Sequence, residues 1–230
     1  MHQITISDIS IRVHRKPIKH VHLTVLPPDG VVRISAPNCM QLETIRAFAA
    51  SKLGWIKKQR AKMQAQPREI PREYVNRETH YFRGRPYLLK VIEKEEKPRV
   101  DYTHREISLQ VRPGSDKSKR AEVLQEWYRR EMKQQVAELI HKWEDEMQVE
   151  VAEFGIKQMK TRWGTCNTGA RRIWLNLELI KKPPHCLEYV VVHELAHFFE
   201  RNHNDRFKSI LDHYYPTWRE VRKELNGLPL

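Results

Sequence analysis

The chain has 230 residues, of which 40% are hydrophobic and 31% charged, and it carries a formal net charge of +13. This length allows one large domain or two small ones, and the composition is ordinary for a globular protein. No run of about 18 apolar residues is present, so we expect no transmembrane helix and no membrane partner. The amino terminus lacks a secretory signal pattern, and three scattered cysteines are too few for a disulfide framework. We therefore expect a cytoplasmic protein.

Positive charge is concentrated in the first half of the chain. Residues 1–115 hold 22 Lys and Arg against 11 Asp and Glu, whereas residues 116–230 hold 20 against 18. Such an asymmetry is typical of proteins with an acidic partner, most often nucleic acid. A solvated, lysine-rich surface has the same composition, so both interpretations stay open.

The first 35 residues are predicted to form strands. Apolar residues alternate over 3–14, and a break in phase near Asp8 predicts a turn or bulge there. A second alternation over 20–26 is followed by the turn sequence of residues 27–30 and a returning strand at 31–35. Together these segments predict a small antiparallel meander.

Helical spacing then replaces the alternation. Apolar residues recur at three or four positions over 41–66, which predicts one helix. Residues 80–92 and 99–111 again look like strands. We therefore predict a β-rich, basic amino-terminal region with one helix over residues 1–115, and a second region over residues 116–230.

The second region is predicted to be mainly helical. Its first helix, over 117–149, has one apolar stripe that includes Trp143, and we expect this stripe to pack in the core. Strands at 151–160 and 171–179 flank a turn-like segment at 162–169. Three further helices are predicted at 187–199, after Pro183-Pro184, and at 205–214 and 217–225, which are split by Pro216.

The helix at 187–199 contains the motif H-E-x-x-H. His193 and His197 are four residues apart, so they lie on one helical face and can point at a common ion. Glu194 follows the first histidine, where its carboxylate can reach a metal-bound water. The flanking residues are apolar, which predicts a buried helix, and a buried histidine pair beside a glutamate is costly unless something binds it. A structural histidine cluster is the alternative.

His203 is the natural third ligand. It lies six residues after the second histidine, which is too far for the same face of one continuous helix. If the helix ends near residues 201–202, the chain can turn and bring His203 back under the ion. Asn202 tolerates the left-handed conformation that such a turn uses, and Asn204 or Asp205 can cap the next helix.

These residues predict a zinc hydrolase. A catalytic Zn2+ takes three protein ligands, here His193, His197 and His203, and keeps one position for water. The ion lowers the pKa of its water toward about 7. Glu194 then acts as general base and passes the proton to the leaving amine.

Two motif regions carry a resemblance to a known family. The segments Trp163-Gly164-Thr165-Cys166 and Asn176-Leu177, the histidine motif with His203, and Phe207 together resemble the YgjP-like metallopeptidases. That zincin family is similar in its motif helix to the SprT-type proteases. Weaker similarities in the first half extend the resemblance over most of the chain, at Arg12, Asp29-Gly30, Ala36-Pro37, Trp55-Ile56 and Gly84.

The resemblance implies a fold, an activity and a site. The fold is α+β, with a β-rich amino-terminal half and a zincin-like carboxy-terminal unit whose active-site helix packs beside a small antiparallel sheet. The activity is hydrolysis of a protein or peptide substrate, with zinc on the three histidines and Glu194 as general base. In zincins, an edge strand beside the motif helix commonly pairs with an extended substrate.

Some features stay open within this resemblance. Glu200 stands where the metzincin motif has glycine, and no methionine follows Met159, so metzincin membership is not implied. Besides the metal, a donor is needed for the oxyanion. By residue type alone the candidates are Tyr214, Tyr215, His213 and Arg162. Cys166 has no second cysteine at C-x-x-C spacing, so we expect a small packed residue.

A binding protein is the alternative function. A nucleic-acid-associated protein would use the basic first half, and its zinc site would be structural or inactive. Structural zinc usually has four protein ligands, so a fourth protein ligand in place of water would favour this alternative. The two functions can also coexist in one chain. The sequence does not fix the oligomeric state.

Overall fold

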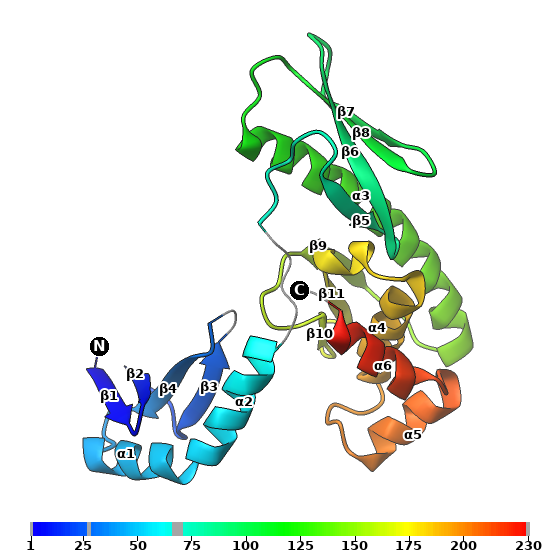
Figure 1. Ribbon diagram of the computed structural model, residues 1–230. Coiled ribbons are helices and arrows are strands. Elements are labelled where there is room, and N and C mark those ends of the chain that lie inside the picture. The colour runs from blue at the N-terminus through cyan, green and yellow to red at the C-terminus, as the bar shows by residue number, and fades with distance from the viewer. Residues whose placement is uncertain (1, 27–28, 66–70, 229–230) are drawn as a thin grey trace. The chain divides into compact units, whose positions relative to one another are not determined.

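The chain folds into two compact units. The computed structural model describes residues 2–26, 29–65 and 71–228, and the units comprise residues 1–68 and 69–228 (Figure 1). The expected boundary at residues 115 and 116 differs from this division. Phe82, Leu89 and Ile107, from before that boundary, share one hydrophobic core with Leu124 and Trp127 from beyond it. Packing therefore assigns the second group of strands to the carboxy-terminal unit.

The first unit contains a four-stranded sheet in the order β1-β2-β4-β3. Its strands are β1 (His2–Ile6), β2 (Ile9–Lys16), β3 (His22–Leu26) and β4 (Val31–Pro37). The predicted antiparallel meander is wrong, because β4 inserts between β2 and β3 and pairs parallel with β2. This order gives the central position to β4, whose inward residues Val32, Ile34 and Ala36 are almost completely buried.

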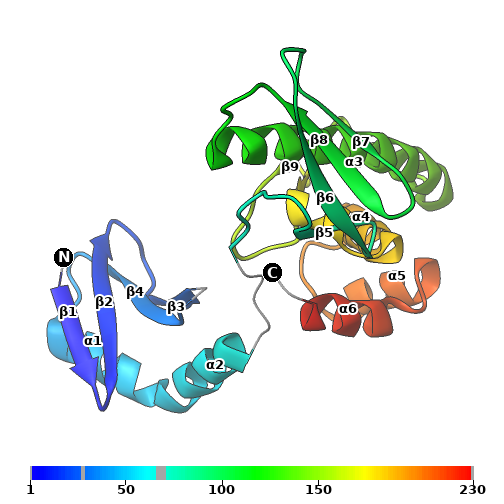
Figure 2. The same cartoon turned by 45° about the horizontal axis from the view of Figure 1, so that its top comes forward.

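Two helices cover one face of this sheet. The predicted single helix is broken at Lys52 (φ −102°, ψ 7°) into α1 (Leu42–Ser51) and α2 (Leu53–Ala65). The two helices lie along one side of the sheet (Figure 2). Ile45 and Ala49 from α1 and Ile56 from α2 share the core with the apolar side of the sheet. The predicted turn at residues 27–30 lies partly outside the described residues, and its last residue, Gly30, has a positive φ of 68°.

The second unit begins with another four-stranded sheet, packed against a long helix. The two strands predicted over 80–111 are in fact two hairpins, and their strands are β5 (Thr79–Phe82), β6 (Arg85–Glu93), β7 (Arg99–Tyr102) and β8 (Glu106–Val111). The long helix α3 (Lys117–Met147) begins at Asp116, whose side chain accepts a hydrogen bond from the Lys119 backbone NH. The predicted stripe, Trp143 included, is buried in the core, as expected.

A small third sheet lies beside the motif helix. Its order is β10-β11-β9, from β9 (Glu153–Lys157), β10 (Gly164–Asn167) and β11 (Arg172–Asn176). β10 and β11 are antiparallel, but β11 and β9 are parallel, so the sheet is mixed and not purely antiparallel. β10 forms within the segment expected to be a turn, and it is an edge strand.

The remaining helices surround the motif. After a short 3-10 helix at Leu177–Lys181 come α4 (Pro184–Ala196), α5 (Asp205–Tyr214) and α6 (Trp218–Gly227). α4 contacts α3, α5 and α6 as well as β10 and β11, so it occupies the middle of the unit. The architecture confirms the predicted α+β class. None of the helices in the described part of the chain is long and apolar enough to cross a bilayer.

Candidate metal centre and active site

The motif helix ends earlier than predicted. Pro184 occupies its first turn, and the helix stops at Ala196, so His197 is the C-cap residue with φ −66° and ψ −16°. Beyond it, the NH of Phe198 donates to Leu195 O at 2.9 Å and the NH of Phe199 donates to Ala196 O at 3.1 Å. These shorter-range bonds tighten the final turn, as is common at helix ends. His193 and His197 keep the expected common face, with ring centroids 5.2 Å apart.

A compact loop returns His203 to the other two histidines. Asn202 does not have the positive φ that was predicted for it. Instead, the Glu200 carboxylate accepts a hydrogen bond from the Asn202 NH at 3.0 Å, and the Asn204 NH donates to Asn202 O at 2.8 Å. Asn204 also caps α5, as predicted, by accepting from the Phe207 NH at 3.0 Å. The hydrogen bond to the Glu200 side chain therefore stabilises this turn, and no left-handed residue is needed at position 202.

The three imidazoles converge on one point. His203 Nε2 lies 3.0 Å from His193 Nε2, and a ligand atom from each ring lies within 4.8 Å of the others. Tetrahedral zinc with Zn–N bonds of about 2.0–2.1 Å would separate two nitrogens by about 3.3 Å. His197 Nδ1 lies 3.1 Å from Glu200 O, a contact that suits an Nδ1–H donor and leaves Nε2 as the metal-facing nitrogen. The donor set therefore fits a metal ion.

Burial keeps these rings neutral. It lowers the pKa of His193 to about 3, and the charges of the other two histidines add to this effect. Burial also lowers the pKa of His197 and of His203. The ring of Phe207 packs against all three histidines, with centroids 4.7–5.0 Å away. Neutral imidazoles with available lone pairs are the state that binds metal.

Glu194 is the buried carboxyl group of the site. Its exposed fraction is 4%, and burial raises its pKa to about 8, although the positive charge of Arg162 opposes the rise. Its carboxyl group lies against the backbone of β10. A Cβ atom at Gly164 would lie 2.4 Å from Glu194 Oε1, so only glycine leaves room for it. This contact explains the glycine in the Trp163-Gly164-Thr165-Cys166 segment.

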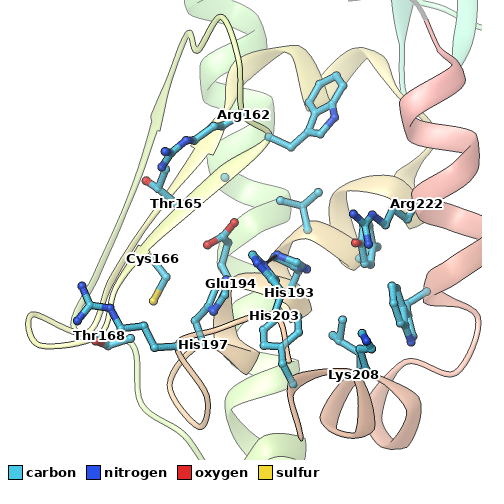
Figure 3. A pocket seen from close by; sticks show the side chains of 18 of the residues that line it. Arg162, Thr165, Cys166, Thr168, His193, Glu194, His197, His203, Lys208 and Arg222 are labelled. Carbon is cyan, nitrogen blue, oxygen red and sulfur yellow. Dashed lines mark hydrogen bonds between the residues drawn. The ribbon is translucent and has the colours of Figure 1, made fainter. Parts of the chain in front are cut away.

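A large cavity opens beside these groups. It has a volume of about 1150 Å³ and is lined by β10, the three histidines, Glu194 and residues of α5 and α6 (Figure 3). Cys166 on β10 lines it too. Burial, together with the nearby Glu194, raises the pKa of its thiol to about 12. The thiol therefore stays protonated at neutral pH, which fits the predicted packing role and not that of a nucleophile.

Three arginines line the cavity, namely Arg162, Arg201 and Arg222, and Arg162 and Arg222 lie on opposite sides of it (Figure 3). Arg162 precedes β10 and Arg222 belongs to α6, and the side chain of neither forms a hydrogen bond or ion pair with the described residues (Figure 3). Of the other oxyanion candidates, Tyr214, Tyr215 and His213 do not line the cavity. Arg222 was not predicted as a site residue, because in the sequence it belongs to the charged, solvent-facing side of an amphipathic helix.

A second group of metal-ligand types lies elsewhere in the unit. His185, Cys186 and Glu224 come within 4.8 Å of one another. They do not line the cavity, and His185 Nε2 already contacts the Glu224 carboxylate at 2.7 Å. Burial raises the pKa of the Cys186 thiol to about 12. The His193–His197–His203 group is therefore the one that combines metal ligands with space for a substrate.

Comparisons with known proteins agree with the motifs. The model of the YgjP-like metallopeptidase domain matches residues 19–228. Among solved structures, the metallopeptidase zymogens abylysin of Pyrococcus abyssi and jannalysin of Methanocaldococcus jannaschii are similar at 18% and 21% identity. Each match covers 39% of this chain and 90% or 92% of the other, with TM-scores of 0.37 and 0.36. Similarities at that level do not establish a shared fold. No curated protein matches.

Proposed function

The chain belongs to the YgjP-like family of metallopeptidases, and we propose that it hydrolyses peptide bonds with zinc held by His193, His197 and His203. As a metallopeptidase it requires a metal ion and acts on a protein or peptide. In the proposal, Glu194 is the general base. The observation that supports it is the convergence of three neutral imidazoles beside a buried carboxyl group at the edge of a large cavity.

Zinc suits this donor set. Imidazole nitrogen is a preferred zinc ligand, and catalytic sites combine three protein ligands with one open position. Among the described residues, the histidine group contains no fourth His, Cys, Asp or Glu ligand, and the cavity adjoins it. A bound zinc ion supplies a Lewis acid that polarises the peptide carbonyl and makes water more acidic. These features support a catalytic over a structural site, and so a peptidase over a binding protein with inactive zinc.

In this proposal, Glu194 transfers protons during the reaction. With its pKa near 8, the carboxyl group is largely protonated at neutral pH when no cation is beside it. Next to a bound cation, a carboxyl group favours its ionised form. Glu194 then accepts a proton from the attacking water and delivers it to the leaving amine nitrogen. The contact with Gly164 fixes the position of the carboxylate during both transfers.

β10 offers a surface for an extended substrate. It is the edge strand of its sheet, so one row of its backbone NH and CO groups has no strand partner among the described residues. Its residues line the cavity next to Glu194. An extended peptide that pairs with this edge would place its backbone beside the histidines, which is the β-augmentation mode of recognition.

We assign oxyanion stabilisation to Arg222. Its positive charge contributes to lowering the pKa of both His193 and His203, so its guanidinium lies on the metal side of the cavity. Arg162 acts instead on Glu194. A guanidinium without a protein counterion can stabilise the negative charge that develops on the carbonyl oxygen. Arg222→Ala should then lower kcat more than it changes KM, and Arg222→Lys should restore part of the loss.

Metal content tests the ligand set. Wild type should hold one zinc per chain, and His203→Asn should lose most of that zinc and the cleavage of an unfolded protein such as casein. His185→Asn is the matched control, because this histidine lies outside the proposed ligand set. A wild type that binds no zinc, or equal zinc loss in both variants, would overturn the proposed site.

A further inference from the structure

The β1-β2-β4-β3 sheet has one apolar face and one polar face. The apolar face packs against α1 and α2. The opposite face is not covered by any described element of its own unit, and we call it the outer face. By strand alternation and register it carries Gln3 and Thr5 of β1, Ser10, Arg12 and His14 of β2, Val31, Arg33 and Ser35 of β4, and His22, Thr24 and Leu26 of β3.

The outer face is basic and has no carboxylate. Residues 1–68 hold 12 Lys and Arg against 3 Asp and Glu, a net charge of +9. The three acidic residues are Asp8, Asp29 and Glu43, and none of them belongs to a strand. Asp8 Oδ1 lies 3.8 Å from Nζ of Lys57 in α2. The basic excess of the chain's first half is thus concentrated in this small unit.

Two arginines stand side by side at the centre of the outer face. Arg12 and Arg33 are register partners on neighbouring strands. Neither side chain forms an ion pair or a hydrogen bond with the described residues, and Arg33 Nε is buried without a partner. Like charges placed directly opposite each other destabilise a sheet. A sequence that keeps such a local conflict usually does so at a functional site.

Hydrogen-bond donors surround this pair. In the arginine row, Gln3 and Thr24 flank Arg12 and Arg33, and the next row holds His14, Ser35 and His22. Contacts from arginine and from small polar side chains are the kind that proteins make to phosphate and sugar. The outer face has no Phe, Tyr or Trp. It therefore lacks both the aromatic anchors of protein–protein interfaces and the stacking platform of base-reading sheets.

We propose that the outer face binds the sugar–phosphate backbone of nucleic acid without sequence preference. Charge complementarity argues for this occupant, because nucleic-acid interfaces are more polar and far more positive than protein interfaces. An acidic protein would meet the same charge, but the outer face offers few apolar side chains for it to bury. The proposal is independent of the peptidase activity, and with it the chain would cleave proteins near nucleic acid.

Fluorescence anisotropy with the full-length chain tests this binding. The probes are a labelled oligo-dT strand and a mixed-sequence duplex, each of about 20 nucleotides per strand. We expect both to bind with a Kd of about 10⁻⁴–10⁻⁶ M at physiological salt, and log Kd to rise linearly with log salt. Arg12→Gln/Arg33→Gln should lower the slope of that line by about 2 and weaken the binding of both probes to the same extent.

Lys52→Gln/Lys58→Gln is the matched control. It removes the same charge from the exposed side chains of residues on the helical side of the unit. Equal weakening by both double variants would mean diffuse attraction and would overturn the proposal, as would wild type that binds neither probe. Tighter binding of polyglutamate than of either oligonucleotide would identify an acidic protein partner instead. If the double variant melts early, Arg12→Gln alone, at an exposed position, should still lower the slope by about 1.

Discussion

Gly164→Ala tests the role of the β10 backbone in holding Glu194. The added Cβ would lie 2.4 Å from Glu194 Oε1 and 2.9 Å from its Cδ and Cγ atoms. The carboxyl group is buried, so it cannot simply swing into water. The methyl group must therefore displace the carboxylate, the strand or both.

The size of the effect follows from that distance. Ordinary van der Waals contact begins near 3.4 Å, so the carboxylate must move by about 1 Å. A misplacement of about 1 Å in a catalytic group can cost roughly 100-fold in rate. We expect kcat for peptide cleavage to fall by about that factor. Metal content should stay at the wild-type level, because the displaced group is not one of the proposed ligands.

Gly169→Ala is the control from the same hairpin. Its Cβ would meet nothing closer than Asn167 Oδ1 at 3.7 Å, so its activity should equal that of wild type. Cleavage rate and zinc content are measured for both variants, with thermal melting to confirm folding. A folded Gly164→Ala with full activity would refute the argument, and so would one that has lost its zinc.

Three further predictions concern stability. In the metal-free chain, the folded pKa of His193, about 3, lies below its unfolded value of 6.5, so its contribution is complete above pH 6.5 and is lost as pH falls toward 3. Urea unfolding of the chelated protein should show that the unfolding free energy falls by about 2 kcal/mol between pH 7 and 5 because of this group. His193→Asn should remove this part of the pH dependence, and an unchanged pH dependence in the variant would contradict the prediction. Asn176→Ala removes hydrogen bonds to the backbone of Met159 and Arg162 and to the Glu178 NH, and should cost about 2–4 kcal/mol in unfolding free energy; a loss within experimental error argues against it. Gly84 has a positive φ of 77°, and a Cβ atom there would lie 2.9 Å from Pro183 Cα, whereas Gly114 has a φ of 74° and open space around it. Gly84→Ala should therefore lower the unfolding free energy more than Gly114→Ala. Equal losses in the two variants would mean that backbone strain alone matters.

The proposed metal-ligand residues could be predicted from the sequence because they lie close together along the chain. His193 and His197 share a face on any helix, so the prediction did not depend on where the helix ends. The helix in fact stops at Ala196, and His203 still reaches the other two rings. Asn204 was also predictable as a cap, since capping depends on the residues next to it.

Features that depend on long-range packing could not be read in this way. The position of β4 between β2 and β3 follows from competition for the centre of a sheet, which alternation within one strand does not reveal. The unit boundary follows from the shared core of β5–β8 and α3. Arg222 reaches the cavity only because α6 packs on α4, about 30 residues after the motif in the sequence.

Turnover by zinc-loaded Glu194→Gln most directly tests the proposed mechanism. The amide has nearly the same shape as the carboxylate but cannot accept the proton of the attacking water. We predict an unchanged zinc content and a loss of kcat of about 10²–10⁴-fold, the usual contribution of a general base. Cleavage at the wild-type rate by this variant, with its zinc in place, would contradict the role assigned to Glu194.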